Sequence, residues 1–399
     1  MSDPDLFDRP RRGRRPAVLT LVFAGVLAAG AATGAWSDAR DHDEGKPTTS
    51  PAGSAKAPGQ REVAEAAARA MADGKSPTEA ARRAVSRSGD RWGAVYSGSE
   101  YAEFEQALDG EYTGVGLWAR GGGDGHIEVA QVQSGGPAER AGIRKGDRLI
   151  SIDGRRTDGL PVTEVVALLR GDAQGDDAPA VGSSVDVGLR RGPYDWHETL
   201  HRALLSTDSV TVRRLAGRSA DAVLIKITSF TKGTGAQVRD AVRHVPEGAG
   251  ILLDLRGNSG GLVAEATEAA SAFLDGGLVA TYDIQGEQHA LHAARGGDTR
   301  HPVVAMVDGG TMSAAELLTG ALQDRGRAVV VGTRTFGKGS VQMPSRLPDG
   351  SVAELTVGHY RTPAGHSLDG RGITPDLEAA DTDVQKQAET VLGGLGDPS

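Results

Sequence analysis

The sequence predicts a multidomain α/β (α+β) protein with three differently patterned parts. Residues 207–380 alternate apolar runs of strand length with helical repeats, a pattern typical of crossover units that build a largely parallel sheet. Residues 111–206 contain closely spaced strand runs and glycine turns, whereas residues 61–110 are rich in strong helix formers. The 399 residues are enough for two or three such domains.

Composition excludes several classes of function. A hydrophobic content of 38% and a charged content of 24% are ordinary for soluble globular domains. The formal charge of −9, without a basic aromatic patch, argues against nucleic acid as a partner. The chain has no cysteine, which excludes disulfides, thiolate metal sites, a cysteine nucleophile and a cysteine-linked lipid anchor. We predict no cofactor and no metal.

Residues 1–36 are a basic tail followed by a targeting segment. Four arginines precede an uncharged run, residues 17–36, which is about long enough to cross a bilayer core of roughly 30 Å as a helix. Arginines on that side predict a cytoplasmic N-terminus and a translocated remainder. A single-pass membrane anchor is favoured, with a cleaved signal peptide and a secreted protein as the open alternative. Residues 37–60 are a linker.

The helical segment, residues 61–110, is predicted to contain helices at Arg61–Met71, Pro77–Val85 and Tyr101–Leu108, with Ser76 as the cap of the second. The segment carries no catalytic signature of its own. We interpret it as a packing or lid element.

Residues 111–206 resemble a PDZ domain of the circularly permuted kind found in bacterial proteases. The run GPAERAGIRKGDRLISIDG carries the resemblance, between the strand IEVAQV and the helix PVTEVVALLRG. A closing strand SVDVGLRR follows, and residues 195–208 are expected to be a loop. The resemblance implies that a protein's exposed, apolar C-terminus adds a strand to this sheet, with its carboxylate held by backbone N–H groups of Gly114, Val115 and Gly116.

The core, residues 207–380, contains two strand–turn–helix units. The first is GILLDLRGNSGGLVAEATEAASAFL, and the second is PVVAMVDGGTMSAAELLTGALQD, in which Ser313 is placed to cap the helix. The strand AVVVG follows, with Lys338 between two glycines just after it. A hydroxyl at a helix start and a lysine on a neighbouring strand suit a nucleophile and its base. Residues 381–399 are expected to be a flexible tail.

The turn RGNSGG permits three interpretations. It fits the nucleophile elbow G-x-S-x-G, it is identical to the motif around the serine of trypsin-like Htr proteases, and it suits an oxyanion-binding turn. The PDZ-like part precedes the core here, which weighs against the Htr-type arrangement. The elbow would need a downstream acid and histidine, and nothing distinguishes His359 or His366 for that role. We therefore favour oxyanion binding over Ser259 as the nucleophile.

Four motifs together resemble the carboxy-terminal processing peptidases, or tail-specific proteases, of serine peptidase family S41. They are ILLDLRGNSGGL, VVAMVDGGTMSAAELLTGALQDRGRAVVVG, TFGKGSVQ and HYRTPAGHSLDGRGITPDL, in family order. The resemblance implies a ClpP/crotonase-like β/α protease core with an inserted PDZ domain. It also implies Ser313 as nucleophile, Lys338 as base and Gln342 as the amide that supports the lysine. Thr311 and Ala315 replace serines that are common in the family, and Ser259 replaces a proline.

The chemistry of these residues is compatible with the same assignment. From the residues alone, the alternative is that Ser313 is only a helix cap and Lys338 a turn residue in solvent. A lysine with a pKa of about 10.4 is protonated at neutral pH, so a lysine base needs a pKa lowered toward 7–8. Burial near Phe336 and Val341 is expected to desolvate the ammonium of Lys338. Gln342 is expected to orient the amine, because an even number of strand residues separates the two.

The tetrahedral oxyanion needs two donors. We expect them to be the N–H of Ala314 and that of Gly260, with Gly261 a near rival. Glu316 and Asp324 are interpreted as structural and Arg256 as an ion-pair residue.

The sequence thus predicts an extracytoplasmic serine endopeptidase that captures protein C-termini and cleaves near them. The alternatives are a catalytically silent membrane-tethered PDZ adaptor and an Htr-type protease that uses Ser259. The sequence leaves open whether the protein forms a homo-oligomer.

Overall fold

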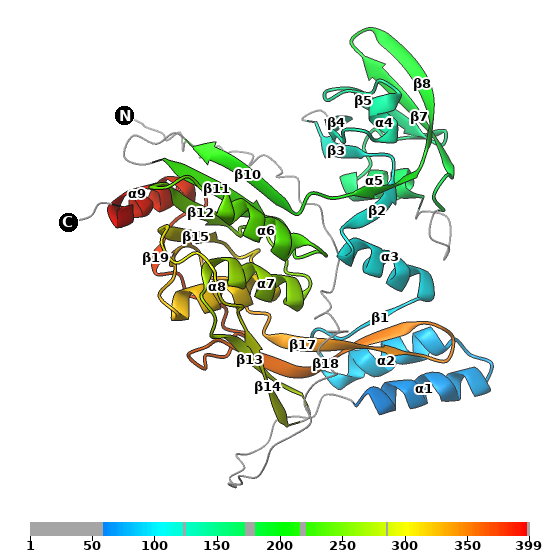
Figure 1. Cartoon of the computed structure of the whole chain (residues 1–399). Helices are drawn as coiled ribbons and strands as arrows, with labels where there is room; N and C mark the ends of the chain where they lie inside the picture. Colours follow the sequence, from blue (N-terminus) through cyan, green and yellow to red (C-terminus); the bar gives the residue numbers. More distant parts are fainter. Residues whose placement is uncertain (1–58, 123–124, 172–179, 216–220, 285, 397–399) are drawn as a thin grey trace, which may run out of the picture. The chain divides into compact units, whose positions relative to one another are not determined.

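The computed structural model describes residues 59–396, apart from 123–124, 172–179, 216–220 and 285. They form two compact units (Figure 1). One is Thr113–Leu205, and the other consists of residues 59–112 and 206–396. No helix in the described part of the chain is long and apolar enough to span a membrane. The predicted anchor and most of the predicted linker lie outside the described residues.

The larger unit is built on a six-stranded sheet with the strand order β10-β11-β12-β15-β16-β19. β10 is antiparallel to β11, and every other neighbouring pair is parallel, so the predicted parallel core is confirmed. The strands are β10 (Val210–Leu215), β11 (Ala222–Ile227), β12 (Gly250–Asp254), β15 (Val303–Val307), β16 (Val329–Gly332) and β19 (Leu377–Glu378).

Helices cover both faces of this sheet. Alternate residues of a strand point to opposite faces. In β12, Leu253 packs in the cluster that contains buried residues of α6, α7 and α8, whereas Leu252 packs with α9. Figure 1 shows α9 on the opposite side of the sheet from the other three. The helices are α6 (Thr234–Arg243), α7 (Val263–Phe273), α8 (Ala314–Asp324) and α9 (Val384–Gly396).

The prediction of a flexible tail at residues 381–399 is therefore wrong for most of its length. Residues 384–396 form α9, and three of its side chains, Val384, Ala388 and Leu392, are buried against the sheet. They recur every four residues, which is a helical repeat, but the polar residues between them and two adjacent glycines obscured it.

A second sheet in the same unit has the order β1-β18-β13-β14, and β17 pairs with β18. The strands are β1 (Ala94–Tyr96), β13 (Leu278–Ile284), β14 (Glu287–His292), β17 (Ser340–Arg346) and β18 (Val352–Arg361). β1 was not predicted. It is only three residues long, AVY, which is too short an apolar run to indicate a strand.

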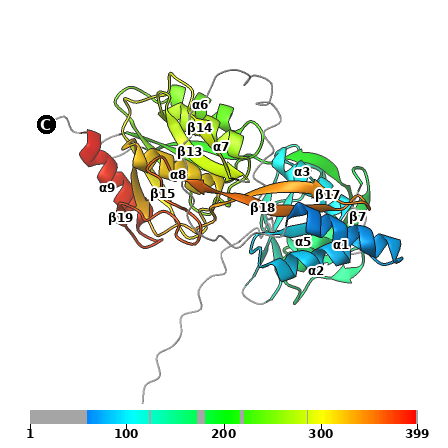
Figure 2. The ribbon, with the colours of Figure 1, turned by 90° about the horizontal axis from the view of Figure 1, so that it is seen from below.

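The predicted helical segment packs against the β17–β18 hairpin (Figures 1 and 2). Its helices are α1 (Gln60–Ala72), α2 (Pro77–Ser88) and α3 (Gly98–Leu108). Buried residues of α1 and α2, such as Val63 and Val85, share a cluster with Ala353 and Leu355 of β18. Ser76 caps α2 as predicted, since its side chain accepts a hydrogen bond from the N–H of Glu79.

The smaller unit has a sheet of order β3-β4-β5-β7-β8, with β6 paired to β5. Its elements are β3 (Leu117–Gly121), β4 (Ile127–Val132), α4 (Pro137–Arg140), β5 (Arg148–Ile152), β6 (Arg155–Arg156), α5 (Val162–Arg170), β7 (Ser184–Arg191) and β8 (Tyr194–His201). β2 (Glu111–Gly114) and β9 (Ala203–Ser206) form a separate two-stranded sheet.

The loop predicted for residues 195–208 is wrong. Most of it belongs to β8 and β9, and β8 pairs with β7 along its whole length. β8 is largely exposed and reads YDWHETLH. Tyr194, Trp196 and Leu200 alternate along it, but Glu198 interrupts them on the same face, which weakens the pattern by which a half-buried strand is recognised.

Candidate active site

Ser313 lies on a strained turn between β15 and α8. Its backbone adopts φ 54° and ψ −116°, and its side chain is buried, with 4% of its surface exposed. These angles belong to the first central position of a type II′ turn, which glycine normally occupies. A side chain in such a conformation costs on the order of 1–3 kcal/mol and is found preferentially at functional sites. A serine on a strained turn between a strand and a helix is the arrangement of a nucleophile elbow.

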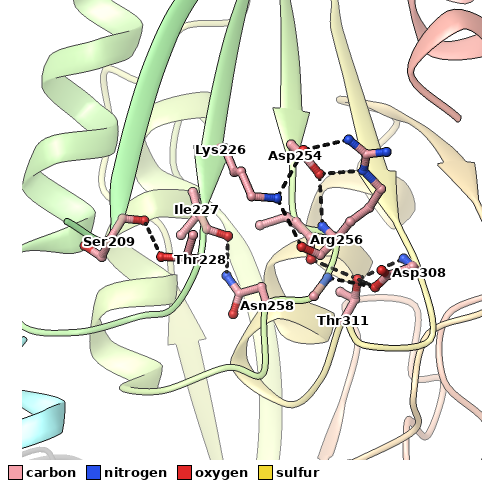
Figure 3. A network of polar contacts seen from close by, with 11 residues as sticks. Ser209, Lys226, Ile227, Thr228, Asp254, Arg256, Asn258, Asp308 and Thr311 are labelled. Atoms are coloured by element: carbon pink, nitrogen blue, oxygen red, sulfur yellow. Dashed lines mark hydrogen bonds and ion pairs between the residues drawn. The ribbon is translucent and has the colours of Figure 1, made fainter. Parts of the chain in front are cut away.

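The turn before Ser313 is tied to the neighbouring glycine turn, residues 256–261 (Figure 3). Thr311 donates from its hydroxyl to the carbonyl of Leu255 at 3.0 Å. The N–H of Met312 donates to the carbonyl of Asn258 at 2.9 Å. The two turns that follow the adjacent parallel strands β12 and β15 are therefore fixed to each other.

Ion pairs brace the base of the glycine turn. Asp254, at the end of β12, pairs with Arg256 at 2.8 Å and with Lys226 of β11 at 3.3 Å (Figure 3). Burial alone would raise the pKa of Asp254, but the two cations hold it below its usual range. The prediction that Arg256 is an ion-pair residue is confirmed.

Glu316 joins the segment that carries Ser313 to the segment that carries Lys338. It is completely buried. One carboxylate oxygen accepts from the backbone N–H groups of both Ser313 and Lys338, each at 2.9 Å. The other oxygen accepts from the hydroxyl of Thr335 at 2.6 Å and from the N–H of Gly337 at 2.7 Å. The backbone nitrogens of Ser313 and Lys338 thus lie within twice 2.9 Å of each other.

Sequence reasoning treated Glu316 as a structural residue of the first helical turn, and its contact with Ser313 has that character. Its bonds to Gly337 and Lys338 were missed, because those residues follow more than twenty positions later in the chain. A glutamate three residues after a helix-start serine is the capping-box signature, and it gives no sign of the second segment.

We expect Glu316→Gln to destabilise the protein by on the order of 3 kcal/mol and to impair any activity of Ser313. An amide has one acceptor oxygen, so its NH₂ group would face two backbone or hydroxyl donors and leave them unsatisfied in the interior. Urea unfolding measures the loss. Glu265→Gln is the matched control, since that half-buried carboxylate also accepts two backbone N–H groups, from Gly233 and Gly235. A loss of stability no larger than that of the control would contradict the role of Glu316 in joining the two segments.

Lys338 is almost completely buried, with 1% of its surface exposed. Desolvation lowers the pKa of Lys338 to about 8, although the carboxyl groups of Glu354, Asp90 and Glu316 act to raise it. The shift is in the direction that a base requires, because a larger fraction of the amine is neutral near pH 7–8. Part of the expected explanation is wrong: Val341 is buried, but Phe336 is 41% exposed.

Trp92, from the connection between α2 and β1, faces the lysine. The Nζ atom of Lys338 lies 5.2 Å from the centre of the Trp92 ring, and Phe336 packs against the same ring at 5.6 Å. Gln342 donates from its amide to the carbonyl of Trp92. The helical segment, which showed no catalytic signature in the sequence, thus supplies a residue at the lysine amine.

Gln342 is fully buried, but the spacing argument that paired it with Lys338 is wrong. Lys338 precedes β17, and a β-bulge lies between Val341 and Gln342, so residues two apart need not share a face. The Oε1 atom of Gln342 is buried without a hydrogen-bond partner among the described residues. This acceptor is available to a donor that enters the site.

The expected oxyanion donors differ in their hydrogen bonding. The N–H of Gly260 donates to the side chain of Asn258 at 2.8 Å, so this N–H already has an acceptor. Gly261 has φ 130°, and an added Cβ would lie 2.3 Å from the carbonyl oxygen of Phe230, so only glycine fits there. Ala314 is the first residue of α8 and is buried. Asn258 was not singled out in the sequence, yet it is fully buried and also donates to Ile227 at 3.0 Å.

Of the residues expected to bind a peptide carboxylate, Gly114 is the last residue of β2, and Val115 and Gly116 connect it to β3. Val115 is 3% exposed, and its carbonyl accepts from the N–H of Ala138 in α4. Gly116 has φ 75°, where an added side chain would be strained.

Comparison with known proteins places both units. Residues 221–379 match the model of peptidase family S41, and residues 128–176 match that of the PDZ domain. The chain is 34% identical over 314 residues to the carboxyl-terminal-processing protease of Synechocystis sp., with 74% of this chain and 72% of that protein covered. It is also 34% identical over 307 residues to the chloroplastic carboxyl-terminal-processing peptidase 3 of Arabidopsis thaliana, with 74% of this chain and 58% of that protein covered. The chain thus spans less than two thirds of the Arabidopsis relative.

Among solved structures, the photosystem II D1 C-terminal processing protease superposes with a TM-score of 0.51 at 27% identity. The match covers 84% of this chain and 97% of that one.

Proposed function

The chain belongs to peptidase family S41, and we propose that it is a serine endopeptidase that cleaves proteins near their C-termini, with Ser313 as nucleophile and Lys338 as base. The observation that carries the proposal is the Glu316 carboxylate, one oxygen of which holds the backbone N–H groups of both residues. The strained turn at Ser313 and the pKa of about 8 at Lys338 support the two roles.

In the proposed reaction, the neutral amine of Lys338 takes the proton of the Ser313 hydroxyl as the oxygen attacks the peptide carbonyl. The tetrahedral intermediate collapses when the resulting ammonium returns a proton to the leaving amine. An acyl-enzyme ester and the released C-terminal peptide result. Lys338 then deprotonates a water molecule that hydrolyses the ester, and the proton passes back to Ser313. Gln342 holds Trp92 in place against the lysine side chain.

The oxyanion of each intermediate is assigned to backbone donors. The N–H of Ala314 is next to the nucleophile at the start of α8, where the helix dipole favours negative charge. Gly261 is the better second donor, because the N–H of Gly260 is already bonded to Asn258. Asn258 is then the residue that holds the donor turn in shape.

We assign substrate capture to the PDZ unit. An extended C-terminus would add as a strand, and its carboxylate would meet the backbone of Gly114, Val115 and Gly116. The names of the relatives, which refer to C-terminal processing, support substrates of this kind. The arginine-flanked apolar run at residues 17–36 supports a membrane-attached or secreted enzyme that acts outside the cytoplasm.

A cleavage assay with two forms of one substrate protein tests this function. The protein ends in an unstructured apolar tail, with a free carboxylate in one form and an amidated C-terminus in the other. We expect rapid cleavage near the free C-terminus and a kcat/KM at least tenfold lower for the amidated form, because a carboxylate bound by backbone donors contributes more than about 1.4 kcal/mol. Ser259→Ala should retain activity. Equal cleavage of both forms would contradict recognition of the C-terminus, and loss of activity in Ser259→Ala would favour the elbow serine.

A further inference from the structure

Glu354 in β18 is a buried carboxyl group for which the proposed mechanism has no use. Its side chain is completely buried, and neither carboxyl oxygen has a hydrogen-bond partner among the described residues. Burial of a carboxyl group without a partner is costly, and most buried polar side chains in proteins are satisfied. We therefore expect Glu354 to have a role other than packing.

The strand register places Glu354 beside the elements that surround the Lys338 amine. Glu354 lies opposite Pro344 of β17 on one side and opposite Ala94 of β1 on the other. Thr356, two residues along the same face, is opposite Gln342. Trp92, whose ring faces the lysine, is two residues before Ala94. Glu354 therefore lies between the two segments that carry Gln342 and Trp92.

The two buried groups act on each other's charge. Burial raises the pKa of Glu354 to about 7, and Lys338 opposes that rise. In return Glu354 is the strongest of three carboxyl groups that raise the pKa of Lys338, ahead of Asp90 and Glu316.

The other two carboxyl groups are already engaged. Asp90 accepts from the N–H and hydroxyl of Thr356, and Glu316 accepts four hydrogen bonds. Tyr101 of α3 lies in the field of Glu354, and Glu105 and Arg346 act on the same tyrosine. Of the carboxyl groups around the lysine, Glu354 is the one without a competing donor among the described residues.

We propose that Glu354 is a positioning residue that acts on Lys338 through its charge. In its ionised form Glu354 stabilises the protonated form of Lys338, and so it sets the pH at which this lysine becomes a base. The proposal rests on the proposed function of Lys338. As the pH rises, Glu354 ionises first, and its negative charge then stabilises the neighbouring ammonium. Lys338 therefore loses its proton at a higher pH than it would if burial alone acted on it. The enzyme would therefore be restrained at neutral pH and more active in mildly alkaline surroundings.

The pH profile of kcat/KM for Glu354→Gln tests this directly. The substitution keeps the shape of the side chain and removes the ionisable carboxyl group. We expect the rising limb of the profile to move to lower pH by about one unit, which is the effect of one charge at close range in a partly polar interior. At pH 7.5, where Glu354 is mostly ionised in the wild type, the variant should be more active than the wild type. Glu287→Gln, an exposed glutamate in β14 of the same sheet, should leave the profile unchanged.

An unshifted profile in an active Glu354→Gln variant would overturn the proposal, as would a shift to higher pH. Glu354→Leu serves as a second neutral variant if the glutamine folds poorly.

A measurement that needs no activity separates this failure from failure of the proposed function. In the Ser313→Ala background, the free energy of unfolding should fall as pH rises from about 4.5 to 7, because the folded state alone keeps the Glu354 proton in that window. That fall should be smaller in Ser313→Ala/Glu354→Gln. If the fall is unchanged, Glu354 is not the buried acid we infer.

Discussion

Replacing Lys338 with methionine is expected to abolish peptide hydrolysis and to stabilise the folded protein at pH 7. Activity should fall by about 10⁴-fold or more, as when a triad member is removed from a serine protease. The stabilisation has a separate cause. Burial has lowered the pKa of Lys338 from 10.5 to about 8, so at pH 7 the folded protein holds an ammonium where it is disfavoured. At about 1.4 kcal/mol per pKa unit, the methionine substitution would raise the free energy of unfolding at pH 7 by as much as about 3 kcal/mol.

The pH dependence gives this prediction a definite sign. Between about pH 8 and 10.5 the unfolded state keeps the lysine proton and the folded state has released it. The free energy of unfolding of the wild type should therefore rise with pH across this window, and the rise should be missing in Lys338→Met. Lys232→Met is the control. The Lys232 side chain is 73% exposed, so its ammonium carries no cost of burial that the substitution could remove. Urea unfolding at pH 7 and pH 10 measures both variants. A Lys338→Met protein less stable than the wild type at pH 7 would contradict the buried-amine account.

Ser313→Ala and Ser313→Gly are both expected to lose activity by about 10⁴-fold or more, since neither retains the attacking oxygen. Their stabilities should differ. At φ 54° and ψ −116° glycine is unstrained, whereas alanine retains the strain of the serine backbone. We expect Ser313→Gly to be more stable than the wild type by about 1–2 kcal/mol, and Ser313→Ala to be no more stable than the wild type.

An ordinary helix cap supplies the comparison for this pair. Ser76 caps α2 at φ −64°, and its hydroxyl accepts from the N–H of Glu79. Ser76→Gly should lower stability by a few tenths of a kcal/mol, as at other N-caps. If Ser313→Gly also lowers stability, the serine is an ordinary cap and the functional interpretation of its backbone loses its support.

Local patterns were sufficient to predict much of the fold. The parallel core follows from buried apolar runs such as GILLD and VVAMV, and Ser76 revealed its helix by capping chemistry. Elements whose apolar pattern is short or interrupted by polar residues were missed or misread. β1 is too short, β8 is too polar, and α9 shows its three buried residues only when a helix is already assumed.

The candidate site divides in the same way. Ser313 and Lys338 stand in recognisable motifs, and the structure adds what surrounds them. Trp92 and Glu354 are distant in sequence from both, and each is brought to the lysine by pairing of β1, β17 and β18. The backbone strain at Ser313 could not be predicted from the sequence, because a serine at a helix start is usually an unstrained N-cap.

Covalent labelling of the nucleophile tests the central claim most directly. A fluorophosphonate transfers its phosphorus to an activated serine oxygen with loss of fluoride, and peptide mapping then locates the adduct. We predict a single adduct on Ser313, formed at a rate that rises with pH through about 8 as Lys338 loses its proton, and little or none in Lys338→Met. An adduct on Ser259, or labelling of Ser313 that is equally fast without the lysine, would contradict the account.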